Sequence, residues 1–156
     1  MEIDGLPLHP LVVHAAVVLI PLVAVLTIVL AVLPGWRWLS RWPAAVGSVV
    51  VTGIAFLATR TGRQLEASRP QLRVLVQVHA QRGDRLAHLT EVLAFIVLAA
   101  AFLLPGPSGL ASGRGARPSR LAIADKALPV LLVVVAVAVL VQCYLTGESG
   151  ARAVWG

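Results

Sequence analysis

Four long apolar runs occupy most of this 156-residue chain, and they constrain its fold more than any other feature. Hydrophobic residues make up 58% of the sequence and charged residues only 13%, which is unlike the composition of a soluble domain. A membrane-spanning helix needs about 20 predominantly apolar residues. We therefore predict an all-α fold, a four-transmembrane-helix bundle that forms one integral membrane domain over residues 1–156 and lies in a lipid bilayer.

The predicted spans cover about residues 11–33, 43–59, 86–104 and 127–145. An amphipathic segment extends the third span at its start, from about residue 70. Residues 105–120 are rich in Gly, Pro, Ser and Arg, which predicts a flexible linker. Little chain is left for a soluble domain, so any chemistry must lie within the bundle or at its ends.

A cluster of tryptophans and arginines separates the first two spans. Trp36, Trp38 and Trp42 lie there in a turn beside Arg37 and Arg41, a combination typical of the headgroup layer of a membrane. We predict that these residues anchor the protein at that interface. The net charge of +6 comes mainly from arginines that flank apolar runs in this way. We therefore expect contacts with anionic headgroups and no nucleic-acid binding.

All four histidines lie at or near the starts of the first and third spans. Alternate spans run in opposite directions, so these starts share one side of the membrane, which we call the histidine face. Helical rise, measured from the far ends of the two spans, places His14 and His88 at about 28 and 24 Å. The same measure places His9 and His79 at about 36 and 38 Å. The sequence thus predicts a deeper pair, His14 with His88, and an outer pair, His9 with His79.

The direction in which each histidine points is harder to predict. His79 and His88 are separated by a rotation of about 180° around a regular helix. They cannot both point into the bundle unless the helix bends, for example at Gly83.

Neutral imidazole is a good axial ligand for haem iron, so two histidines at matched depth on different helices can hold a b-type haem. Under this interpretation the candidate cofactor-binding residues are His9, His14, His79 and His88, with Arg63, Arg73 and Arg82 as candidate partners of the haem propionates. The candidate iron ligands are His14, His79 and His88.

Two other interpretations stay open. His88 and Glu91 are three residues apart and share a helical face, so they could contribute to a zinc or copper site, in a metal-binding protein or small-solute permease. Alternatively the histidines only form hydrogen bonds at the interface, in a cofactor-free structural or assembly subunit. No nucleophilic catalytic constellation is evident, so we favour an electron-transfer or accessory subunit over a stand-alone enzyme.

The second and fourth spans end alike. Thr61-Gly62 follows one and Thr146-Gly147 follows the other, and a glutamate comes soon after each pair. Two related helical hairpins would give this pattern, and so would chance.

Three segments resemble a bacterial membrane family catalogued as domain of unknown function 2231. The string GLPLHPLVVHAAVVLIPL, residues 5–22, is similar to the family's opening motif, with His9-Pro10 and Val13-His14 at the two histidine positions. The Phe-Pro-Ile usual after the second histidine is replaced by residues 15–17, Ala-Ala-Val. The stretch VHAQRGDRLAHLTEVL is similar to the third helix, where His79 fits best, and TGESGARAVWG to the Gly-rich C-terminus.

The resemblance implies a multi-pass protein of a bacterial inner membrane, with His9, His14 and His79 as its histidine set. Related domains occur joined to cytochrome c or Rieske modules, which implies redox work with a partner redox subunit or as a homo-oligomer. No Lys or Arg precedes the first span, whereas Arg37 and Arg41 follow it. Because basic residues favour the cytoplasmic side, we expect the N-terminus and the histidine face to lie outside the cytoplasm. The same N-terminal segment, with Glu2 and Asp4, predicts no cleaved signal peptide.

Overall fold

Prolines determine where three helices end in the computed structural model, which describes residues 2–3 and 6–156. Leu33, Arg69 and Leu104 each precede a proline, and their φ/ψ angles are −116°/79°, −135°/72° and −68°/137°. Proline disfavours the α-helical conformation in the residue before it, because its ring collides with that residue's backbone. Each of these three residues therefore closes a helix, and the chain turns.

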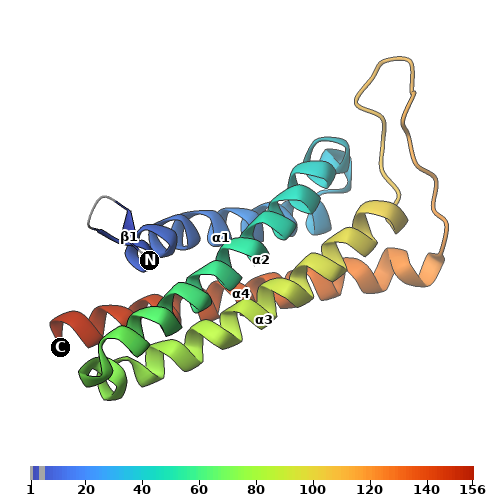
Figure 1. Ribbon diagram of the computed structural model, residues 1–156. Coiled ribbons are helices and arrows are strands. Elements are labelled where there is room, and N and C mark those ends of the chain that lie inside the picture. The colour runs from blue at the N-terminus through green and yellow to red at the C-terminus, as the bar shows by residue number, and fades with distance from the viewer. Residues whose placement is uncertain (1, 4–5) are drawn as a thin grey trace.

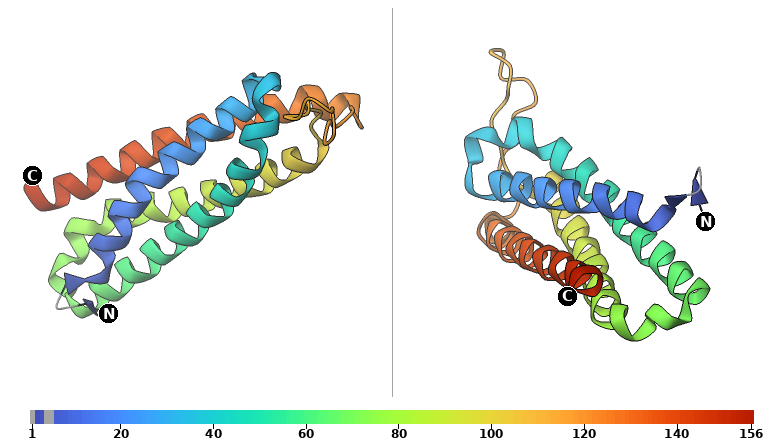
Figure 2. Two further views of the ribbon diagram at one scale, coloured as in Figure 1. Left: turned by 90° about the horizontal axis from the view of Figure 1, so that it is seen from above. Right: turned by 90° about the vertical axis from the view of Figure 1, so that its left-hand side faces the viewer.

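The resulting helices are α1 (Leu8–Val32), α2 (Arg37–Ser68), α3 (Arg73–Leu103) and α4 (Ala122–Trp155) (Figure 1). Each packs against the next, and α4 also packs against α1, so that α1 and α3 lie on one diagonal of the bundle (Figure 2). All four are long and apolar enough to cross a membrane. The predicted fold class, a four-helix transmembrane bundle, is confirmed.

Short elements complete the chain. Two-residue strands, β1 (Glu2–Ile3) and β2 (Leu6–Pro7), pair antiparallel just before α1. Single 3-10 turns, Pro34–Trp36 and Pro70–Leu72, join α1 to α2 and α2 to α3. Asp4, and Gly5 at the start of the N-terminal motif, lie outside the described residues.

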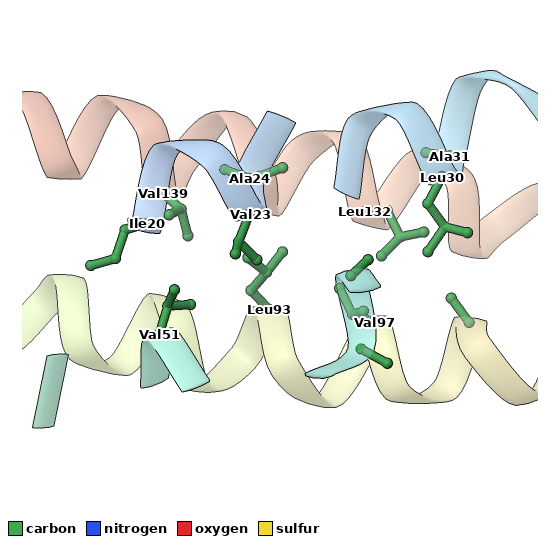
Figure 3. Packing of buried hydrophobic residues seen from close by; sticks show 14 of the residues in the cluster. Ile20, Val23, Ala24, Leu30, Ala31, Val51, Leu93, Val97, Leu132 and Val139 are labelled. Atoms are coloured by element: carbon green, nitrogen blue, oxygen red, sulfur yellow. The ribbon is translucent and has the colours of Figure 1, made fainter. Parts of the chain in front are cut away.

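Branched apolar side chains from all four helices fill the centre of the bundle. Ile20 of α1, Val51 of α2, Leu93 of α3 and Val139 of α4 meet there and are at most 1% exposed (Figure 3). Many of the other buried positions are alanines, and small residues allow transmembrane helices to approach closely. The outer surface is also apolar, for example at Val18, which is 65% exposed. A bundle that is apolar on both sides of its helices suits a lipid environment.

The helices are longer than the predicted spans. Helix α2 has 32 residues, or about 48 Å at 1.5 Å per residue, whereas the hydrocarbon layer is about 30 Å thick. Helix α4 continues through the glycine-rich C-terminal segment to Trp155. The helix ends therefore extend beyond the hydrocarbon layer, and the histidine face is formed by such ends.

The tryptophan–arginine cluster differs from its prediction in two ways. Only Trp36 lies in the interhelical 3-10 turn, and the rest of the cluster forms the first turns of α2, because the chain becomes α-helical again at Arg37. Arg37 and Arg41 are also not exposed anchors, since they are only 6% and 4% exposed. The three tryptophans are exposed by 47–58%, as expected of interface residues.

The two buried arginines complete the ends of other helices. Arg37 Nε donates to Leu30 O at 3.1 Å, at the end of α1. Arg41 donates to Ala101 O and Leu104 O, both at 2.9 Å, at the end of α3. The last four carbonyl groups of a helix have no partner within it, and a cation there also opposes the negative end of the helix dipole. This requirement explains why these guanidinium groups are buried.

Candidate functional site

The structure brings together two of the four histidines, His9 of α1 and His79 of α3. Their ring centroids are 6.2 Å apart and their ring planes make an angle of 77°. Both side chains are half-buried. Because α1 and α3 are diagonal in the bundle, the two rings lie opposite each other across its end.

The neighbouring helix holds each ring in place. His9 Nδ1 lies 3.1 Å from Ala58 O and 3.2 Å from Thr61 Oγ1, both on α2. His79 Nδ1 lies 2.9 Å from Thr146 O on α4. A carbonyl oxygen can only accept, so Nδ1 is the donor in each neutral ring and Nε2 carries the lone pair. Within the described chain, neither Nε2 atom has a hydrogen-bond partner.

The carbonyl groups that hold the two rings have matching surroundings. A hydroxyl group three residues further along the helix donates to each of them. Thr61 Oγ1 donates to Ala58 O at 3.1 Å, and Ser149 Oγ donates to Thr146 O at 2.9 Å. The carbonyl therefore lies between an imidazole and a hydroxyl in both cases.

A glycine follows each of these hydroxyl residues and packs against the imidazole. A Cβ atom added at Gly62 would lie 3.1 Å from His9 Cε1, and one added at Gly150 would lie 3.0 Å from His79 Nδ1. A Cβ atom at Gly147 would meet nothing within 4 Å. The two histidines thus have similar surroundings, but the matching residues are not the two Thr-Gly pairs of the sequence pattern. Thr61-Gly62 corresponds to Ser149-Gly150.

His14 and His88, the deeper pair of the sequence prediction, are not brought together. Both lie on the outside of the bundle. His14 Nδ1 contacts Pro10 O of its own helix at 2.6 Å. The side chain of His88 is 77% exposed, and its Nδ1 lies 3.7 Å from Glu91 Oε2. The outward position of His88 agrees with its half-turn offset from His79.

The three arginines predicted to pair with propionates lie at the histidine face, and each already has an acidic partner. The pairs are Arg63 with Asp84 at 2.9 Å, Arg73 with Glu66 at 3.2 Å, and Arg82 with Glu148 at 3.4 Å. Arg82 is the least exposed of the three and also donates to Leu145 O at 2.7 Å. It therefore ties α3 to α4 close to His79.

Sequence reasoning picked out Thr61-Gly62 but paired it with Thr146-Gly147, and so missed Ser149 and Gly150. These two residues lie on the helix adjacent to His79 and carry no ligand chemistry of their own. The signal that could have found them is a second hydroxyl residue followed by glycine, three residues after Thr146-Gly147. No cluster of three or more His, Cys, Asp or Glu side chains suited to a metal ion occurs in residues 2–3 and 6–156.

These features define a four-helix integral membrane protein with a pair of imidazoles at one end of the bundle. The family described as "predicted membrane protein (DUF2231)" matches residues 5–156, and the chain belongs to this family. The resemblance in the sequence is thereby confirmed. Neither a curated protein nor a solved structure matches the chain.

Proposed function

We propose that this protein binds a b-type haem through His9 and His79 and acts in electron transfer as a small membrane subunit. The observation that carries this proposal is the 6.2 Å separation between the two ring centroids. Bonds between a metal and an imidazole nitrogen are about 2.0 Å long, so a metal bound by two facing Nε2 atoms separates the ring centroids by roughly 6 Å. The spacing of the two rings therefore suits one metal between them.

The surroundings of the rings also fit this role. Metal-binding histidines commonly donate their other N–H to a carbonyl group, which fixes the tautomer and the ring orientation. Both rings have such a carbonyl, at Ala58 and Thr146. Glycine at positions 62 and 150 gives each ring space that a larger side chain would take. The donor set thus fits an iron held by two imidazoles, and a haem bound there would supply one-electron redox chemistry.

The rest of the chain limits where this group can be held. Ile20, Val51 and Val139 fill the adjoining part of the core, so the group belongs at the end of the bundle. Arg63, Arg73 and Arg82 remain candidate partners of the two haem propionates, and two of them would exchange a carboxylate of the protein for one of the haem. The side chains of Arg63 and Arg73 are 68% and 80% exposed, and ion pairs of such side chains contribute at most about 1 kcal/mol, so the exchange costs little there.

The same ion pairs favour a second candidate, a cofactor-free structural or assembly subunit. On that hypothesis the charges of these three arginines are already balanced by the protein, and the imidazoles serve only to join the helices. A third candidate is a zinc or copper ion held by the same two imidazoles.

The setting of the site is part of the proposal. We place the histidine face outside the cytoplasm of a bacterial inner membrane, because Arg37 and Arg41 follow the first span and no basic residue precedes it. A partner redox subunit or a second copy of the chain would exchange electrons with the site.

The absorption spectrum of the full chain, produced with ample haem and purified in detergent, tests the proposal. We expect a Soret band that shifts on reduction and one haem per chain. The near-perpendicular ring planes further predict a strongly anisotropic low-spin electron paramagnetic resonance signal from the oxidised protein. A colourless protein containing one zinc or copper would support the metal-ion candidate and overturn the haem. A colourless, metal-free protein would support the structural subunit.

A further inference from the structure

The end of the bundle opposite the histidine face carries a cavity of about 340 Å³. It lies between the first turns of α2 and the loop that joins α3 to α4, which projects from this end of the bundle (Figure 1). Trp38, Arg41 and Trp42 of α2 form one wall. The loop supplies the other wall, including Arg114 and Arg117. A volume of this size is at the lower end of the range for small-molecule sites.

The lining of this cavity is strongly cationic. It contains three arginines and, among the described residues, no aspartate or glutamate. Arg41 uses two of its N–H groups on helix-end carbonyls, and Arg117 uses Nη1 on Ala101 O at 3.1 Å. A guanidinium group has five N–H donors, so both retain donors for a further partner. None of the three forms an ion pair with the described part of the chain.

We propose that this cavity binds the phosphate of an anionic phospholipid headgroup. Guanidinium groups match phosphate oxygens in charge and geometry. Basic pockets between transmembrane helices are suited to anionic headgroups for the same reason. The site is distinct from the histidine pair, so the proposal stands independently of haem binding.

The aromatic part of the lining points to a lipid and not to free phosphate. The guanidinium carbon of Arg117 lies 5.7 Å from the ring centroid of Trp42, a cation–π contact. On another side, Trp42 packs edge-to-face against Phe102, whose side chain is 54% exposed on the outer surface of the bundle. The cationic cavity is therefore continuous with an apolar surface that acyl chains can cover. The headgroup and the acyl chains of one lipid would thus contact adjacent parts of the protein.

The loop is shaped to hold its arginines in this place. Gly106 and Arg117 exchange two backbone hydrogen bonds, of 3.1 and 2.9 Å, which close the base of the loop. Gly115, also in the lining, has φ of +86°, a conformation that favours glycine. Gly109 packs so closely that an added Cβ atom would lie 2.3 Å from Trp38 Cε3. The predicted flexibility of residues 105–120 stays a prediction, but the two ends of this segment are paired and one part of it rests on α2.

Native mass spectrometry of the full chain, titrated with phosphatidylglycerol or with phosphatidylcholine, tests the proposal. We expect tighter binding of phosphatidylglycerol. The substitution Arg114→Gln should weaken that binding about fivefold, as expected for the loss of one basic residue near an anionic lipid. It should weaken phosphatidylcholine binding less, because the choline cation offsets the charge of that lipid's phosphate. Arg114 donates to no helix end, so this variant should fold normally.

Arg120→Gln is the matched control, because Arg120 lies in the same loop and carries the same charge but does not line the cavity. It should bind phosphatidylglycerol like the wild type. Equal affinity for the two lipids, or an equal loss in both variants, would overturn the proposal. Displacement of phosphatidylglycerol by millimolar inorganic phosphate would overturn the assignment to a lipid. The absorption spectrum should be the same in all these proteins, so failure here is distinguishable from failure of the haem proposal.

Discussion

At both ends of the bundle, side chains of one helix donate to backbone carbonyl groups of a neighbouring helix, but the side chains and the carbonyl groups differ. At the loop end, Arg37 and Arg41 donate to carbonyl groups at the ends of α1 and α3. At the histidine face, His9 and His79 donate to Ala58 O and Thr146 O, which lie within α2 and α4, more than two turns before those helices end. In both places a side chain from one helix bonds a carbonyl of a neighbouring helix.

The difference lies in what remains on the side chain after this contact. A buried arginine is a permanent cation with donors only, so it stabilises helix ends and attracts anions. An imidazole that donates through Nδ1 keeps a lone pair on Nε2, which can bind a metal. The contact with a neighbouring helix therefore completes a helix end at the loop end, whereas at the histidine face it leaves a nitrogen lone pair on each ring.

The largest effect is expected for Arg41→Met. This change keeps an apolar stem but leaves Leu104 O without its donor, whereas Ala101 O keeps the hydrogen bond from Arg117 Nη1. A buried carbonyl group that loses its partner costs about 1–3 kcal/mol, so the free energy of unfolding should fall by about 1–3 kcal/mol. Unfolding in mixed detergent–denaturant micelles measures it. Arg114→Met is the control and should change the free energy of unfolding by no more than about 0.5 kcal/mol. An equal loss of unfolding free energy in both variants would contradict the proposed structural role of Arg41 at the loop end.

A smaller effect, on binding and not on folding, is expected for Gly150→Ala. The new Cβ atom would lie 3.0 Å from both His79 Nδ1 and Cε1, so the ring must move. Disturbing a residue that orients a metal ligand typically lowers affinity 10–100-fold, and we expect a loss of about 100-fold in haem affinity. Alanine favours a helix over glycine by up to about 1 kcal/mol, so the helix itself should not be weakened.

Gly147→Ala is its control, because a Cβ atom there meets nothing within 4 Å. Haem titration of the two proteins should separate them clearly. If both bind haem like the wild type, the ring of His79 does not need its glycine.

The smallest effect is expected for Thr61→Val. The variant removes the hydroxyl group 3.2 Å from His9 Nδ1 and leaves Ala58 O in place. We expect a roughly 10-fold loss of haem affinity, the lower end for such a neighbour. Ser149→Ala removes the corresponding hydroxyl group on α4, which does not contact His79 directly, and should have less effect. A larger loss in Ser149→Ala would contradict the assigned contacts.

The sequence predicted the fold well because the membrane simplifies the problem. Runs of about 20 apolar residues must become helices in lipid, since every backbone group needs a partner within the segment. The sequence predicted a fourth span only as far as about residue 145, whereas α4 continues to Trp155. Side-chain contacts support this glycine-rich end of the helix. Glu148 pairs with Arg152 one turn later at 2.7 Å, and Ser149 donates to Thr146 O. Contacts of this kind can be predicted only after the segment is assumed to be helical, because the helix brings these residues together.

The candidate site was predicted in part. Helical rise placed His9 and His79 at one level, and the structure brings these two together. Helical rise could not predict the direction in which His14 points. Helix α1 is apolar all round, so its sequence periodicity indicates no inward face. The burial of Arg37 and Arg41 depends on where the ends of α1 and α3 lie in space. No local pattern around the two arginines contains that information.

The haem content of four single variants, purified from haem-replete cells, tests the account most directly. His9→Ala and His79→Ala should each lose the bound haem, whereas His14→Ala and His88→Ala should retain it at the level of the wild type. Loss of haem from His14→Ala or His88→Ala, with retention in His9→Ala and His79→Ala, would contradict the assignment of the ligand pair.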